Sequence, residues 1–211
     1  MFNRVNGNRN VVTKNRKTSN DFTGIKVSTG IDLYISQGNK NKVTVEADEN
    51  LHDIIITEVE NGVLKVYSEK SIWRAKARKV HVTIKDLSLL KATSGSDVYG
   101  KGTINTNEIS ISATSGADIK ITVAATSVET SSTSGSDIKI AGTTTNHASS
   151  ATSGASIGAY QLESKNVIAK ATSGADINIY ASEKLDAKAT SGGDIDFKGN
   201  TKQVNKKSSS G

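Results

Sequence analysis

Hydrophobic and polar residues alternate along the second half of the chain, and the alternation restarts every 18 to 21 residues. Each restart carries the motif Thr-Ser-Gly, followed by a small residue, then Asp or Ser, then Val or Ile. The six motif glycines are Gly95, Gly116, Gly135, Gly154, Gly174 and Gly192. A repeat of this length is typical of a β-solenoid, in which each coil stacks on the one before it.

Within each repeat the aliphatic residues share one parity, which predicts that they lie on one face of a β-strand. The residues three positions after each glycine are Val98, Ile119, Ile138, Ile157, Ile177 and Ile195. We expect this face to form the interior, where like side chains stack in columns. The serine before each glycine has the same parity, so Ser115 and its equivalents are expected to form a buried ladder of hydroxyl groups.

The first half of the chain shows a less regular version of the same pattern. Residues 27–35, VSTGIDLYI, repeat the motif in altered form, and short alternating segments are separated by turns such as Glu60-Asn61-Gly62. Segment 69–79 interrupts the alternation and is expected to project as a loop or short hairpin.

The sequence therefore predicts an all-β protein with a single parallel β-solenoid domain over residues 21–207. Irregular coils are expected at 21–91 and regular coils at 92–200, after a basic segment at 1–20. Together they would make about nine or ten coils of 18–21 residues.

Composition narrows the possible chemistry. The chain has no cysteine, which excludes disulfides, thiolate catalysis and cysteine metal sites, and leaves the redox compartment open. Only 4% of the residues are aromatic and 35% are hydrophobic, so the core must be narrow. Proline is absent too, which suits a chain whose amides donate to neighbouring strands.

The formal charge of +6 is concentrated toward the N-terminal end. Residues 1–20 contain five arginine or lysine residues and no acid, and a second basic cluster lies at 74–79. Such clusters attract anionic polymers or membranes, although most basic runs are solvated surface. Few aromatic residues lie among these charges, so we expect no nucleic-acid binding. The chain has no apolar stretch long enough for a transmembrane segment.

Aspartate recurs two residues after the motif glycine, on the parity that faces solvent: Asp97, Asp118, Asp137, Asp176 and Asp194, with Ser156 replacing it once. Stacked unit charges repel by roughly 1 kcal/mol in water, so the column needs compensation. Calcium between successive carboxylates is one interpretation. In the favoured interpretation no cofactor is bound, and turn amides, threonine hydroxyls and the nearby Lys120 and Lys139 neutralise the charge of the carboxylates. We favour it because calcium needs more oxygen ligands than one carboxylate per coil supplies.

Trp73 lies among basic residues and is the candidate ligand-binding residue, together with Arg74, Lys76 and Arg78. An indole ring beside cations can stack on a sugar and grip an acidic polysaccharide. The alternative is that Trp73 packs across the flank of the solenoid. No catalytic motif is present, and we assign no catalytic residue.

Several stretches of the chain resemble the bacterial GIN-domain family, whose members are described as adhesin head domains. They are NVVTKNRKTSNDFTGIKVSTGIDLYISQGNKNKVTVEADENL from residue 10, KVHVTIKDLSLLKATSGSDV from residue 79, and the later copies of the motif. The resemblance covers about residues 10–207. It implies a single-stranded, right-handed parallel β-helix and an exported protein of Gram-negative bacteria, located in the periplasm, in the outer membrane or at the cell surface. Members usually begin with a leader, and the polar start MFNRVNGNRN lacks one, so we expect that a leader was removed.

Three functions follow from these observations. The favoured one is a non-catalytic binding module, an adhesin that recognises a glycan or a surface protein of host or bacterium through the solenoid flank or its loops. A polysaccharide lyase or hydrolase is the first alternative, because similar helices carry such enzymes. It would need carboxylates clustered in a cleft. The second alternative is a structural assembly element that forms homo-oligomers through the strand edges of a terminal coil.

Overall fold

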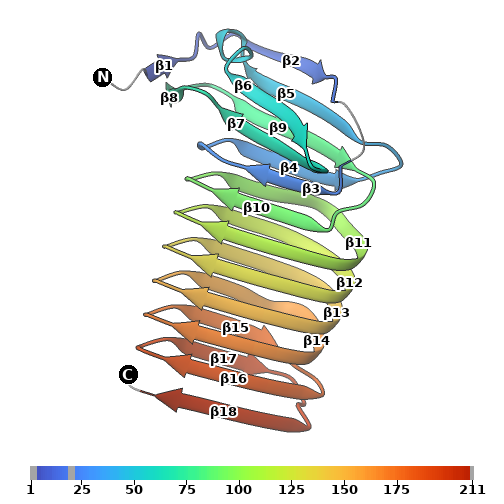
Figure 1. The fold of residues 1–211 in the computed structure, drawn as a ribbon, viewed down its shortest axis with the longest axis vertical. Coiled ribbons are helices and arrows are strands. Elements are labelled where there is room, and N and C mark those ends of the chain that lie inside the picture. Colours follow the sequence, from blue (N-terminus) through green and yellow to red (C-terminus); the bar gives the residue numbers. More distant parts are fainter. Residues whose placement is uncertain (1–3, 19–21, 210–211) are drawn as a thin grey trace.

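The computed structural model describes residues 4–18 and 22–209 and shows a β-solenoid of about six turns (Figure 1). The coils stack along the long axis, from an N-terminal cap at the top of the view to β18 at the bottom. Apart from one 3₁₀ turn (Glu49–Leu51), the regular structure of the described residues is all β-strand. The predicted all-β solenoid is therefore confirmed.

Each central coil consists of one long, bent strand. These strands are β11 (Asp97–Thr114), β12 (Asp118–Thr133), β13 (Asp137–Thr152) and β14 (Ser156–Thr172). Each pairs in parallel with the next, so that equivalent residues of the repeat lie side by side, as Ile119 and Ile138 do. The last two coils are each divided into two strands. They are β15 (Asp176–Tyr180) with β16 (Lys184–Thr190), and β17 (Asp194–Lys198) with β18 (Gln203–Ser209).

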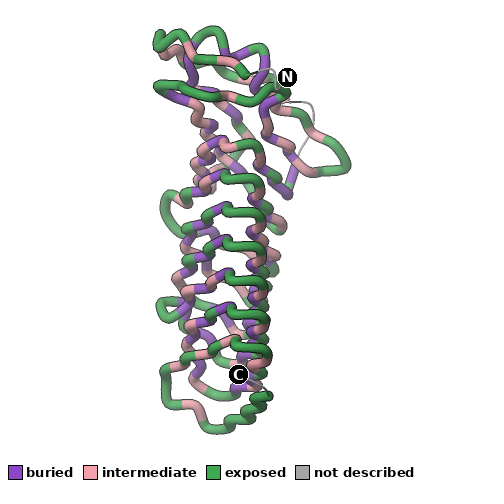
Figure 2. Tube along the Cα trace, turned by 90° about the vertical axis from the view of Figure 1, so that its left-hand side faces the viewer, coloured by how far each residue is buried: buried purple, intermediate pink, exposed green. Residues whose placement is uncertain are grey.

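The aliphatic face of the repeat fills the interior. Figure 2 shows that buried positions recur along the stacked coils from one layer to the next. Val98, Ile119, Ile138, Ile157 and Ile177 are at most 2% exposed, as expected from their parity. Burying one such side chain contributes roughly 1.5–3 kcal/mol. The stacked columns of aliphatic side chains are therefore the main source of stability in the regular coils.

The predicted ladder of buried serine hydroxyls is wrong. Ser115 and its equivalents lie in exposed turns with φ between 52° and 57°, and the glycines after them have φ between 65° and 73°. Side chains alternate only along extended backbone, and two successive left-handed residues break the alternation. The backbone holds these turns together instead: the Gly116 amide donates to the Ser134 carbonyl at 3.2 Å, and the same bond recurs from coil to coil.

Further layers continue the stack toward the N-terminal end. They are β10 (Leu89–Thr93), which leads into β11; β3 (Gly24–Val27) with β4 (Asp32–Gln37); and β7 (Val63–Ser68) with β9 (Arg78–Ile84). Thr29 and Gly30 have φ of 62° and 71°, and the Gly30 amide donates to the Ser94 carbonyl at 3.1 Å. Residues 27–35 are therefore a copy of the motif, as predicted.

Antiparallel strands close this end of the solenoid. The cap contains β5 (Lys42–Asp48) against β9, β2 (Val11–Arg16) against β5, and β6 (Ile55–Glu60) against β7. The β6–β7 hairpin turns at Asn61 and Gly62, which have φ of 51° and 75°, as the sequence predicted. The expected nine or ten coils are too many, because alternation does not distinguish parallel from antiparallel strands and part of segment 21–91 folds back as this cap.

Segment 69–79 leaves the solenoid between β7 and β9. Its strand β8 (Ser71–Arg74) pairs in parallel with β1 (Arg4–Asn6), and the pair projects beside the cap. The predicted interruption is thus a strand held by the N-terminal segment. Residues 1–3, 19 and 20 of the predicted basic segment lie outside the described residues. Among residues 4–18 and 22–209, no helix has the length and apolar character needed to cross a membrane.

Candidate functional site

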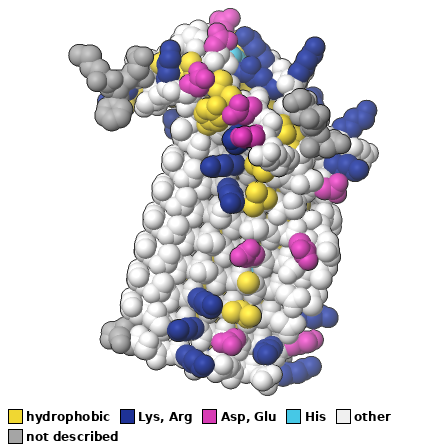
Figure 3. Space-filling view, viewed as in Figure 1, with side chains coloured by type: hydrophobic (Ala, Val, Ile, Leu, Met, Phe, Trp, Pro, Cys, Tyr) yellow, Lys and Arg dark blue, Asp and Glu magenta, His cyan; other side chains and the backbone are white. Residues whose placement is uncertain are grey.

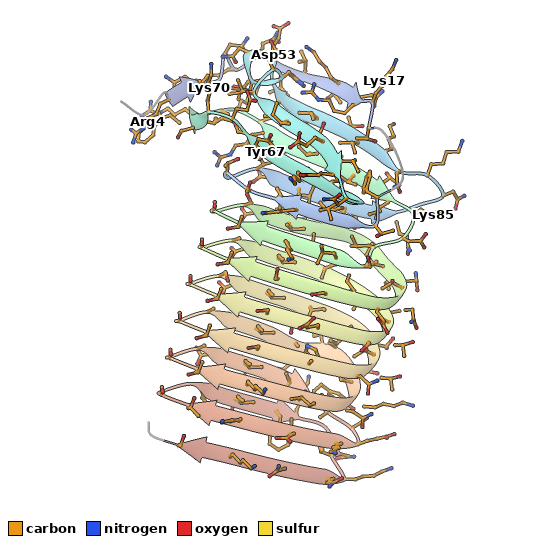
Figure 4. The ribbon with its side chains drawn as sticks, in the orientation of Figure 1. Arg4, Lys17, Asp53, Tyr67, Lys70 and Lys85 are labelled. Carbon is orange, nitrogen blue, oxygen red and sulfur yellow. The ribbon has the colours of Figure 1, made fainter. Side chains whose placement is uncertain are left out.

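Trp73 lies on the projecting strand β8, and 55% of its surface is exposed. Arg4, labelled in Figure 4, lies on the paired strand β1. Its guanidinium carbon lies 4.4 Å from the centre of the indole ring. This is the geometry of a cation–π contact, worth about 0.5–1 kcal/mol at an exposed site. The indole is therefore oriented by Arg4 and remains accessible to a ligand.

A basic hollow lies next to this strand pair. It has a volume of about 360 Å³ and is lined by Gly7, Arg9, Arg74, Ala75 and Lys76. Among the described residues, the side-chain ion pairs involve other cations, namely Lys65, Lys79 and His81. Three positive charges thus surround the hollow without an ion-pair partner in the described part of the chain.

Asp48 holds the backbone around the hollow in place. Its buried carboxylate accepts hydrogen bonds from the amides of Arg9 at 3.0 Å, Lys76 at 3.1 Å and Ala77 at 3.0 Å. Burial tends to raise the pKa of Asp48, but the three backbone hydrogen bonds outweigh it, so the pKa is lowered. Arg9 itself has φ of 63°, a conformation uncommon for a residue with a side chain.

The structure separates Arg78 from the other three predicted ligand-binding residues. Arg78 lies on β9 and its guanidinium approaches Gly30, near the carboxylates of Asp32 and Asp97. Burial raises the pKa of both carboxyls, and the positive charge of Arg78 opposes that rise. Arg74 and Lys76 remain at the hollow, where Arg9 joins them. Arg78 therefore helps to neutralise the aspartate column instead of lining the basic hollow.

The aspartate column is continuous along the solenoid flank. Strand register places Asp97 beside Asp118, Asp118 beside Asp137, and Asp176 beside Asp194, with Ser156 between Asp137 and Asp176. The Ser156 hydroxyl donates to the Asp137 carboxylate across one of these steps. The column extends one layer further than predicted, because Asp32 lies close enough to Asp97 to raise its pKa.

Burial and repulsion between neighbouring carboxylates raise the pKa values of Asp97 and Asp118 in the column. Burial raises the pKa of Asp118, and the carboxylates of Asp137 and Asp97 raise it further, whereas Lys139 opposes them. Burial also raises the pKa of Asp97, with Asp32 adding to the effect. Within the described residues, no group of three or more His, Cys, Asp or Glu side chains has the arrangement of a metal site. The column places like charges in a line, with at most one carboxylate per layer and Ser156 in the layer that lacks one.

Comparison with known protein families gives a match over residues 21–201 to the family described as "Putative auto-transporter adhesin, head GIN domain". The chain belongs to this family. No curated protein matches the chain.

Three solved structures share this GIN-domain fold. A "putative adhesin" from Bacteroides fragilis is 20% identical, with a TM-score of 0.89, and the alignment covers 98% of this chain and 96% of the other. A "putative lipid binding protein" from Parabacteroides distasonis is 22% identical, with a TM-score of 0.79 and the same coverage. A "putative adhesin" from Parabacteroides distasonis is 22% identical, with a TM-score of 0.80, and covers 99% of this chain and 98% of that one. None of these descriptions names an enzyme.

Sequence reasoning missed two groups of this GIN domain. Asp32 was signalled by the motif copy at 27–35, where an aspartate follows the glycine at the usual distance. Arg4 and Arg9 belong to the basic segment 1–20 that the sequence indicated, but its spacing does not place them at the site. Only the pairing of β1 with β8 and the bonds to Asp48 bring them to Trp73 and Lys76. Figure 3 shows charged side chains gathered over the cap, whereas the edge formed by the stacked turns lacks them on this face.

Proposed function

We propose that this GIN domain is a non-catalytic adhesin head, exported to the bacterial surface, which binds an anionic polysaccharide at its N-terminal cap. The observation that carries the proposal is the basic hollow lined by Arg9, Arg74 and Lys76. Guanidinium groups bind carboxylates and sulfates through paired hydrogen bonds. The exposed Trp73 next to the hollow would stack on a sugar ring of the same chain.

The rigidity of the site supports binding over mere surface charge. Asp48 fixes the backbone at Arg9 and Lys76, and the Gly7 amide donates to the Arg74 carbonyl at 2.7 Å. Groups that are already in position lose less conformational freedom when a ligand binds. A solvated basic run without such constraints would bind polyanions weakly and with little selectivity.

An enzyme of polysaccharide cleavage fits the geometry less well. Catalysis of that kind needs carboxylates gathered around a substrate cleft. The carboxylates of the aspartate column lie at most one per layer along the flank, and the residues that line the basic hollow include no acidic side chain. We therefore propose binding without bond cleavage, and neither a cofactor nor nucleic acid has a part in it.

The test is binding of the purified chain to immobilised polygalacturonate and heparin, with neutral dextran as reference. The double variant Arg9→Ala with Arg74→Ala should bind the acidic polymers at least about tenfold more weakly, because charge-assisted hydrogen bonds are lost. The matched control Lys170→Ala with Lys188→Ala removes the same charge from exposed positions on β14 and β16 and should bind normally. Equal losses in both double variants would contradict the proposal.

Anionic lipid is the competing ligand, since one structural relative is described as a lipid-binding protein. Sedimentation with vesicles of phosphatidylglycerol and phosphatidylcholine, compared with phosphatidylcholine alone, separates the two. Binding to the anionic vesicles that depends on Arg9 and Arg74, without binding to the acidic polysaccharides, would overturn the polysaccharide proposal. Release of unsaturated sugars from polygalacturonate would overturn the non-catalytic assignment.

A further inference from the structure

A second hollow lies on the flank of the regular coils, away from the cap. It has a volume of about 470 Å³ and spans four successive strands from β12 to β15. The side chains that matter to its chemistry are Lys120, Lys139, Gly158, Tyr160, Gln161 and Asn178. This is within the range of about 300–1,000 Å³ that is common for small-molecule sites.

Gly158 forms part of the hollow, although the fold does not require glycine there. Strand register places it in an outward column after Lys120 and Lys139 and before Asn178. Its backbone is outside the left-handed region, and an added Cβ would only make ordinary contacts, 3.8 Å from Lys139 Cγ and 3.9 Å from the Ile138 carbonyl oxygen. Glycine at this position therefore leaves a space that a lysine or asparagine would fill.

Tyr160 stands beside that space because of a β-bulge. The register of β13 with β14 passes from Lys139 opposite Gly158 to Ala141 opposite Gln161, so β14 contains one extra residue. The extra residue makes Tyr160 and Gln161 consecutive outward side chains, and Tyr160 is 36% exposed. Lys198 Nζ lies 5.2 Å from the centre of the Tyr160 ring and helps to hold the ring in place.

The polar groups around the hollow suit hydroxyl groups. Neither the Gln161 nor the Asn178 side-chain amide makes a hydrogen bond to another described residue, so both are available as donors and acceptors. Lys120 and Lys139 are two residues from Asp118 and Asp137 on the same face, and these carboxylates offset their positive charge. The hollow therefore combines an apolar part, formed by Ile121, Ile140 and Ala141, with polar groups of little net charge.

We infer that this flank hollow binds one ring of a neutral saccharide, stacked on Tyr160 and hydrogen-bonded through Gln161, Asn178 and the two lysines. Aromatic rings pack against the apolar faces of flat ligands, while amides at the edge select hydroxyl positions. The site goes beyond the proposed function, since it takes an uncharged ligand and shares no residue with the basic hollow. A glycan chain that touches both sites would gain from their combined effect.

The experiment uses an array of mannose-, galactose- and N-acetylglucosamine-based oligosaccharides, followed by calorimetry with those that bind. Tyr160→Ala should weaken binding at least about tenfold, as expected for loss of a stacking ring. Gly158→Lys should abolish binding, because it fills the hollow with the residue found at the equivalent position of the two preceding coils. Circular dichroism and melting curves verify the fold, and Asn178→Ala replaces Gly158→Lys should the latter not fold.

Tyr99→Ala is the matched control, because Tyr99 is a tyrosine of similar exposure that precedes Lys120 in the outward column of Gly158 and lies outside the hollow. It should leave binding unchanged, as should Lys170→Ala with Lys188→Ala, two exposed positions outside the hollow. No binding to any neutral oligosaccharide at millimolar concentration would overturn the inference, and so would binding that Tyr160→Ala and Gly158→Lys leave intact. Either result would leave the acidic-polysaccharide proposal unaffected, since that proposal depends on Arg9 and Arg74.

Discussion

The carboxylate of Asp48 occupies the space that a side chain on Gly7 would need. These two residues lie in different parts of the cap, and their close approach allows the Asp48 carboxylate to bind three backbone amides around the basic hollow. Glycine is required at residue 7 for room and not for its backbone angles. The relationship ties the shape of the N-terminal segment to that of segment 69–79.

Gly7→Ala should therefore destabilise the cap. The new Cβ would displace the Asp48 carboxylate, and each buried hydrogen bond lost in this way costs about 1–3 kcal/mol. We expect faster proteolysis at residues 4–10 and weaker binding to polygalacturonate. Limited proteolysis and equilibrium unfolding measure both effects. Gly62→Ala is a contrasting variant: a Cβ at residue 62 would meet open space, so this change tests only the cost of the left-handed backbone angle. Wild-type behaviour of Gly7→Ala would show that the Asp48 contact is dispensable.

The aspartate column predicts an unusual dependence of stability on pH. The pKa of Asp118 is higher in the folded chain than its usual value of 3.8, so ionisation costs the folded state free energy. The stabilising contribution is complete below that value and is lost as the pH rises through the folded pKa. Asp118→Asn should thus be more stable than the wild type at pH 7, by about 0.2–1 kcal/mol.

Urea unfolding between pH 3 and pH 8 measures this difference. The advantage of Asp118→Asn should vanish at the acidic end, where the wild-type carboxyl is protonated. Asp186→Asn, on β16 and outside the column, is the control and should show no such trend. A pH-independent difference would indicate that repulsion within the column is not its source.

Calcium provides a second test of the same column. Because the described residues form no group of three acidic or histidine ligands, we expect calcium and magnesium at equal concentration to change the melting temperature equally. A rise specific to calcium, and absent from Asp118→Asn with Asp137→Asn, would instead support calcium binding between successive carboxylates.

His147 is buried in the interior column between Val128 and Val167. Its Nε2 lies 2.9 Å from the Thr130 hydroxyl, and burial lowers its pKa from 6.5 to about 4. As the pH falls below 6.5, the imidazole of His147 is protonated in the unfolded chain before it is protonated in the folded one. The stability that His147 contributes above pH 6.5 is therefore lost as the pH falls toward 4. His147→Val should remove this loss and be more stable than the wild type at pH 5 by about 2 kcal/mol.

The measurement is again equilibrium unfolding, here at pH 5 and pH 8. The gain from His147→Val should be much larger at pH 5 than at pH 8, since only the acidic condition charges the unfolded histidine. A gain of the same size at both values would mean that packing, and not protonation, separates the two proteins.

Lys206 marks the end of an interior column. It lies in register with Ala187, which follows Ala169 in the preceding coil, and its Nζ is 4.4 Å from the centre of the Phe197 ring. An inward-pointing charge at an open edge opposes strand addition by another molecule. Lys206→Ile should therefore produce concentration-dependent dimers in sedimentation or light scattering, whereas Lys207→Ile should not. A monomeric Lys206→Ile at high concentration would show that other features protect this edge.

The regular coils were predictable from sequence because one spacing sets the register of every layer. Ile138 is buried beside Ile119, as its position in the alternation of hydrophobic and polar residues predicted. The predicted burial of Ser115 was wrong because side chains do not alternate between faces across two successive left-handed residues. The antiparallel cap was not predicted because Val43 and Val45 alternate with polar residues in the same way whether their strand runs parallel or antiparallel to β9.

The candidate sites depend on contacts that repeat spacing does not encode. Arg9 reaches the hollow through a hydrogen bond to Asp48, a residue far along the chain. Tyr160 faces outward because β14 has one residue more than β13 at that point, and a change of spacing by one residue is easily overlooked among variable repeats. Departures from regularity, and not the repeat itself, therefore distinguish these surfaces.

The backbone bonds between successive turns, such as that from Gly116 to Ser134, join only adjacent coils. Each unit thus relies on its immediate neighbours, and whole units can be added or deleted without rebuilding either terminus. Every insertion would move the basic end about 4.8 Å farther from the opposite one. Such a scaffold works as an adjustable spacer, whose reach evolution can set in small equal steps.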